Sequence, residues 1–158
     1  MLASKQLANH IHQVYFGGNW TEVSHKDTLS KITLKTASKK INGFNTLVAL
    51  TFHIHYFTKV QLRVLEDGIL DGKDSESYDH PKLNGEQDWI SLQDQMWKDA
   101  ERYTKLISEL PDSILNQAYT NEKYGTYASN ILGLIEHTHY HLGQIVILNK
   151  LIQKKLNR

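Results

Sequence analysis

The feature that most constrains the fold is a helical repeat of apolar residues near the C-terminus. Between residues 131 and 152 such residues recur every three or four positions. The repeat consists of Ile131, Leu134, Ile135, Thr138, Leu142, Ile145, Leu148 and Ile152. Because an α-helix has about 3.6 residues per turn, this spacing places all of them on one face. We therefore predict a long helix over about residues 127–154 with that face buried.

Two histidines lie at the edge of the buried face. His137 and His141 are four residues apart, so their rings lie one helical turn from each other on the same side. Each ring can offer one nitrogen to a shared metal ion, which then needs a third ligand from elsewhere. The best donor is His53, because residues 47–57 are the other stretch in which histidines interrupt an apolar run. The sequence thus predicts a metal site formed by His53, His137 and His141; the alternative is a structural polar cluster without metal.

Further polar residues surround these three in the sequence. His55 and His139 each lie two residues from a predicted ligand, which on a helix turns a side chain about 200° away, so we expect both to face elsewhere. His55 stays a candidate for the pocket around the site. Ring N–H groups of metal-binding histidines usually need an acceptor, and the nearby candidates are Glu136 and Gln144. A long connecting segment offers Tyr78, Asp79 and His80 as residues that could cover the site, but the favoured interpretation of these residues is a solvated turn.

Helical spacing also predicts three earlier long helices. The first covers residues 3–16 and ends at paired glycines, and the second covers residues 34–67 with Thr33 as N-cap and Gly43 as a point of bending. The third begins near Asp88 and ends at Pro111. We also expect a helical turn up to Leu29, a short helix over residues 111–117, an extended segment over residues 119–127, and Trp20 covering one end of the bundle.

Residues 71–85 are polar, contain Gly, Pro, Asn and Ser, and show no periodicity. Such a long connection in a compact domain can join neighbouring helices that run in the same direction. The expected fold is all-α, a four-helix bundle with a long crossover loop, formed by residues 1–158 as a single domain.

Composition narrows the possible functions. The chain has 18 basic and 17 acidic side chains and a formal net charge of +1, which argues against a nucleic-acid-binding surface. It contains no cysteine, which excludes disulfides, thiolate ligands and a cysteine nucleophile. No apolar run approaches the roughly 20 residues that span a bilayer, and the first residues lack the apolar core of a secretory signal. We therefore expect a cytoplasmic protein without a membrane partner.

The motif around His53 and the motif that contains His137 and His141 resemble those of the DinB-like, YfiT-like group of four-helix-bundle metal-binding proteins. The resemblance is strongest in residues 52–57 and in residues 135–145, where the His-x-x-x-His pair is followed by Gly-Gln-Ile. Supporting similarities occur at residues 17–21, 97–101 and 123–127. The resemblance implies a zinc or nickel ion held by His53, His137 and His141, with open positions for water or substrate. The family usually has arginine after the last histidine, whereas this chain has Leu142, so no role of that arginine can be carried over.

Family members of known activity include transferases that use low-molecular-weight thiols and a thiol-dependent isomerase. Three imidazole ligands leave a position at which water or a thiol can be activated at neutral pH. We therefore expect a hydrolase or a thiol-dependent transferase that acts on a small molecule, with the thiol supplied from outside because the chain has no cysteine. The alternative is a non-catalytic stress-response or binding module in which the metal only braces the helices. Exposed apolar residues on a long helix also allow a homodimer.

Overall fold

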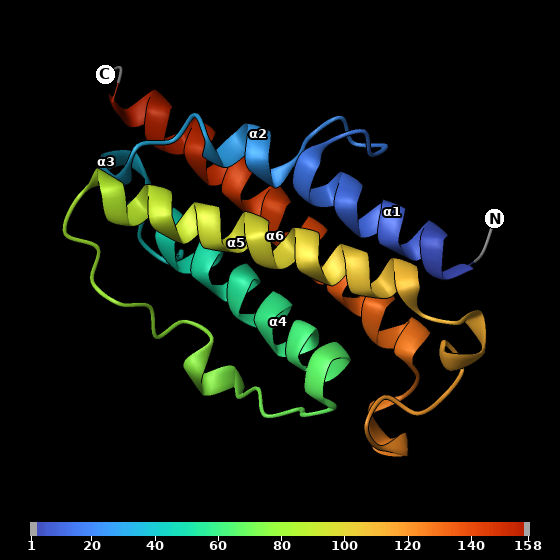
Figure 1. Ribbon diagram of the computed structural model, residues 1–158. Helices are drawn as coiled ribbons and strands as arrows, with labels where there is room; N and C mark the ends of the chain where they lie inside the picture. The colour runs from blue at the N-terminus through green and yellow to red at the C-terminus, as the bar shows by residue number, and fades with distance from the viewer. Residues whose placement is uncertain (1–2, 157–158) are drawn as a thin grey trace.

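The computed structural model describes residues 3–156, which form helices joined by turns and loops. Four long helices pack together (Figure 1): α1 (Ala3–Phe16), α4 (Leu47–Asp67), α5 (Glu86–Glu109) and α6 (Tyr127–Leu156). The shorter elements are α2 (His25–Leu29), α3 (Leu34–Ala37) and the 3-10 turns η1 (Asp74–Glu76), η2 (Asp112–Ile114) and η3 (Glu122–Tyr124). The described residues contain no strand and only one isolated β-bridge, between Ala118 and Thr126. The all-α prediction is therefore confirmed.

The long helices surround a common core. Both α1 and α4 pack against α5 and against α6. In Figure 1, α4 and α5 run in the same direction, and the segment 68–85 returns along the length of the helices to join them. This is the role predicted for the long polar connection.

The apolar repeat of α6 faces this core. All eight of its members are buried, and none has more than 5% of its surface exposed. Thr138, the polar member, donates a hydrogen bond from Oγ1 to the carbonyl of Leu134 at 2.6 Å, so its hydroxyl is satisfied inside the helix. The predicted helix and its buried face are both confirmed.

The single helix predicted over residues 34–67 is wrong. The chain forms α3, leaves helical conformation over residues 38–46, and begins α4 at Leu47. Gly43 has a φ of +81°, a conformation that an α-helix does not contain, so one helix cannot run through this position. Thr46 then caps α4 by accepting a hydrogen bond from the backbone N–H of Ala49 at 3.1 Å. Phe44 keeps helical spacing with its neighbours, but its side chain is 53% exposed.

Three smaller predictions were only partly correct. Helix α1 ends at Phe16 as predicted, but α5 begins at Glu86, ahead of Asp88. The short helix expected over residues 111–117 is a single 3-10 turn, whose Asp112 carboxylate accepts hydrogen bonds from the backbone N–H groups of Ala3 and Ser4 at the start of α1. The segment expected to be extended, residues 119–127, contains the turn η3.

Trp20 does not cover the end of the helices, because its side chain is fully exposed. The neighbouring Asn19 turns inward instead, with 8% of its surface exposed. No helix among residues 3–156 is both long and apolar enough to cross a membrane.

Candidate metal centre

Three histidines from two helices converge at one point. His53 lies on α4, and His137 and His141 lie one turn apart on α6. The Nε2 atom of His137 is 2.9 Å from that of His53 and 3.1 Å from that of His141. Two nitrogens that each bind one zinc ion at about 2.1 Å can be at most about 4.2 Å apart, so both distances suit a shared ion. The structure therefore brings together the three residues that the sequence singled out.

The hydrogen bonds of Ser77 determine which nitrogen of His53 carries the proton. The Ser77 hydroxyl donates to the carbonyl of Asp74 at 2.7 Å, so its oxygen must accept the hydrogen bond from His53 Nδ1, at 2.9 Å. The proton of His53 is thus on Nδ1. Its Nε2 atom presents a bare lone pair to the centre of the cluster.

Gln144 has the same effect on His141. Its amide NH2 group donates to Tyr140 Oη at 3.0 Å, and its Oε1 accepts a hydrogen bond from His141 Nδ1 at 2.7 Å. The Nε2 atom of His141 therefore also presents a lone pair to the centre. Gln144 is the acceptor predicted from the sequence, whereas Glu136, the other candidate, is exposed.

The Nε2 lone pairs of His53 and His141 both point at Nε2 of His137, and His137 can relieve the repulsion with only one of them. A proton on its Nε2 can be donated to one of the two neighbouring rings, which leaves the other ring without a donor. Its Nδ1 is buried without a hydrogen-bond partner among the described residues, so a proton there gains nothing. At least one of the two Nε2–Nε2 contacts, each about 3 Å long, thus has no proton to share, an arrangement that fits a cation, and the residues present therefore suit a divalent metal ion.

The rings are neutral at physiological pH. Burial, with a further contribution from neighbouring histidines, lowers the pKa of His53 and of His137 to about 4. Burial also lowers the pKa of His141. Neutral imidazole is the form that binds metal, so protons do not compete for these nitrogens near pH 7.

The segment between α4 and α5 covers one side of the cluster. The ring of Tyr78 stacks on that of His53, with a centroid separation of 4.1 Å and an interplanar angle of 11°. Phe57 packs edge-on against both His53 and His137, at 5.0 and 5.1 Å. Tyr78 thus covers the site, although a solvated turn was the favoured interpretation of this segment. Ser77 was missed because nothing in a polar loop sequence indicates which hydroxyl will reach a helix.

The other two candidate histidines face away from the cluster. His55 is buried, and its Nε2 lies 2.7 Å from the carboxylate of Asp99 on α5. The ring of His139 lies 6.4 Å from that of His10 on α1. Both histidines thus face away from the predicted ligands, as their offset of two residues along the helix predicted.

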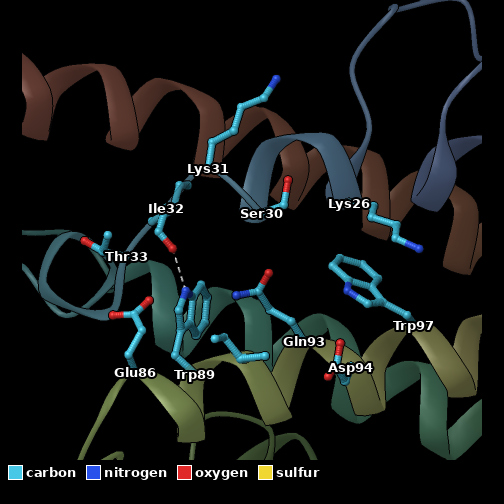
Figure 2. Close-up of a pocket in the computed structure, with 11 residues that line it drawn as sticks. Lys26, Ser30, Lys31, Ile32, Thr33, Glu86, Trp89, Gln93, Asp94 and Trp97 are labelled. Carbon is cyan, nitrogen blue, oxygen red and sulfur yellow. Dashed lines mark hydrogen bonds between the residues drawn. The ribbon is translucent and has the colours of Figure 1, made fainter.

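A pocket of about 270 Å³ opens beside His137. Besides His137 it is lined by residues without a charged side chain, namely Phe57, Gln61, Tyr124, Ser129, Asn130, Gly133 and Leu134. A larger pocket, of about 420 Å³, lies between α2 and the N-terminal half of α5, away from the cluster (Figure 2). None of the three histidines lines the larger pocket, whereas His137 lines the smaller one, which therefore gives an outside molecule access to this ring.

The described residues thus define an all-helical protein with a buried three-histidine cluster that could hold a metal ion. No family model matches the chain, and no match was found among the curated proteins or the solved structures.

Proposed function

We propose that the chain is a mononuclear metalloprotein of the DinB-like type, in which His53, His137 and His141 hold zinc or nickel, and that it acts on a small molecule as a hydrolase or a thiol-dependent transferase. The observation that carries the proposal is the convergence of three Nε2 atoms on one point, with the Nδ1 protons of two rings turned outward by Ser77 and Gln144. The motif resemblance in residues 52–57 and 135–145 supports the same assignment.

A divalent cation held there would supply Lewis-acid chemistry, lowering the pKa of a coordinated water or thiol towards neutrality. The protein's own residues prepare the site for it. Ser77 and Gln144 keep the two imidazoles in the binding tautomer, and Tyr78 and Phe57 exclude water from the sides of the rings.

The pocket beside His137 indicates what kind of substrate the site takes. Its polar groups are the amides of Gln61 and Asn130 and the hydroxyls of Ser129 and Tyr124, and it holds no acidic side chain, lysine or arginine. The side chains of the pocket therefore offer no ion pair to a charged substrate, and a bound cation would be the nearest charge to it. We infer a small polar substrate or co-substrate whose groups form hydrogen bonds with these amides and hydroxyls.

The burial of His53 and His141, which are 5% and 6% exposed, also supports the second candidate, a non-catalytic module braced by the metal. The two candidates differ in whether a coordination position is open. Cobalt(II) in place of the native ion reports this directly, because its visible spectrum changes when a small thiol such as 2-mercaptoethanol binds. A changed spectrum supports the enzyme, and an unchanged spectrum supports the structural role.

Elemental analysis of the untagged protein tests the metal site itself. We expect one zinc or nickel ion per chain, and loss of the ion in His137→Ala. His12→Ala is the matched control, because His12 is an exposed histidine on α1. If His137→Ala retains the full metal content, the proposed site is wrong.

A further inference from the structure

The loop between α1 and α2 displays a fully exposed tryptophan. Trp20 is fully accessible to solvent, whereas the other two tryptophans, Trp89 and Trp97, are buried. An exposed indole leaves up to about 250 Å² of aromatic surface in water. Large exposed apolar groups beside other apolar surface commonly mark interaction sites.

The conformation of the loop holds Trp20 outward. The buried Asn19 donates from Nδ2 to the carbonyls of Gln13 and Val23, at 2.8 and 2.7 Å. Its Oδ1 accepts from the backbone N–H and the hydroxyl of Thr21, at 2.9 and 2.6 Å. Four hydrogen bonds from one side chain thus fix the residues on both sides of Trp20. An anchor that is already in place costs less conformational entropy when it binds.

An apolar groove lies directly beside this loop. It has a volume of about 300 Å³ and is lined by Thr21, Val23, His139, Leu142, Gly143, Val146 and Ile147. None of these residues is an Asp, Glu, Lys or Arg. Gly143 lacks a side chain and has open space around it, which leaves room for an inserted group. A cavity of about 150 Å³ already accommodates benzene, so this groove is large enough for an indole ring.

We propose that the groove receives Trp20 from a second copy of the chain, and that two copies form a symmetric dimer through this face. A two-fold contact requires a surface that is complementary to itself, with each protruding group opposite the partner's recess. A protruding side chain and a groove side by side on one surface meet this condition. Trp20 does not occupy the groove of its own chain, because its ring is fully exposed.

The neighbouring surface of α6 can complete the interface. Tyr140, Ile147 and Leu151 are exposed, and their spacing of seven and four residues places them on one side of the helix. Ile147 belongs both to this stripe and to the groove. Together with Trp20 these side chains expose on the order of 500 Å² per copy, against roughly 800 Å² per partner in a standard interface. The apolar area thus reaches more than half of what a stable dimer buries.

Sedimentation velocity from about 1 to 200 µM protein tests this proposal. We expect the wild type to reach twice the chain mass of 18.2 kDa. Trp20→Ala and Ile147→Asp should each weaken dimerisation by at least about 30-fold, as expected of residues at the centre of an interface. Phe44→Ala is the matched control, since it removes an exposed aromatic residue outside the groove, and it should leave the dimer unchanged.

Mixing the two variants separates the proposed contact from other dimers. The Trp20→Ala chain keeps its groove and the Ile147→Asp chain keeps its tryptophan, so the mixture regains one of the two contacts and should associate more tightly than either variant alone. The proposal is overturned if the wild type stays monomeric, if Trp20→Ala leaves the dimer intact, or if the mixture associates no better than its components. Circular dichroism confirms that each variant is folded.

Discussion

Replacing Gln144 by leucine should weaken metal binding without removing a ligand. Gln144 Oε1 accepts the Nδ1 proton of His141 at 2.7 Å and so keeps the lone pair of the ring directed at the cluster. Leucine cannot accept this hydrogen bond, and the proton can then move to Nε2, where it competes with the metal. Loss of such a supporting partner typically costs 10- to 100-fold in metal affinity, or about 1.4–2.7 kcal/mol.

The assay is competition for zinc against a chromophoric chelator at neutral pH. Gln153→Leu is the matched control, because it makes the same change at an exposed position of the same helix. Tyr140→Phe removes the other partner of the Gln144 amide and should change the dissociation constant little. Gln144→Glu keeps an acceptor oxygen and should retain affinity close to that of the wild type.

The reasoning is refuted if Gln144→Leu binds zinc within about 3-fold of the wild type while His137→Ala loses it. That result would mean that the tautomer of His141 is not set by Gln144. A loss of affinity in Gln153→Leu of the same size would show that leucine on α6 acts through the fold and not through the ring.

Three further predictions concern stability. Zinc at 100 times its dissociation constant should stabilise the folded protein by about 2.7 kcal/mol, so a chelator should lower the melting temperature of the wild type in calorimetry but leave His137→Ala unchanged. Burial lowers the pKa of His25 to about 3, so the unfolded state alone takes up this proton as the pH falls below 6.5. The contribution of His25 to the free energy of unfolding is therefore complete above pH 6.5 and is about 2 kcal/mol smaller at pH 5. Urea titrations at pH 7 and at pH 5 should show a smaller loss of stability in His25→Gln than in the wild type. The same loss in both proteins would show that His25 is not the cause. Trp89 is fully buried and donates from Nε1 to the carbonyl of Ile32 at 2.7 Å (Figure 2), so Trp89→Phe should lower the free energy of unfolding of the monomer by about 2–4 kcal/mol. At a protein concentration low enough to keep the chain monomeric, Trp20→Phe should change this free energy by less than about 0.5 kcal/mol. Similar losses in the two variants would show that burial is not the cause.

The parts of the structure that the sequence predicts are those in which burial repeats with the period of the helix. The repeat in α6 is an example, since every predicted core residue is buried. The pairing of His137 with His141 follows from the same geometry. His53 was found because residues 47–57 are the other stretch in which histidines interrupt an apolar run. In each case a local pattern reports directly on which side of a helix the core lies.

Periodicity fails where a local feature overrides it. Ile41 and Phe44 continue the helical spacing into α4, yet residues 38–46 are not helical. Gly43 at positive φ and the cap at Thr46 determine the backbone there. Trp20 is a different failure, because its exposure depends on four hydrogen bonds made by the residue before it. Hydrophobicity alone predicts burial for both Phe44 and Trp20.

The contribution of the long connection to the site follows from the direction of the helices. Since α4 and α5 run in the same direction, the chain must return along the length of α4 before α5 can begin (Figure 1). On that path it passes His53, and η1 orients the hydroxyl of Ser77 by offering it the carbonyl of Asp74. A short turn in a polar segment thereby determines which nitrogen of a helical histidine is free. Shortening the segment at residues 69–73 while keeping residues 74–78 should therefore weaken metal binding if it moves Ser77 away from His53. Metal affinity should stay unchanged if Ser77 keeps its hydrogen bond to His53.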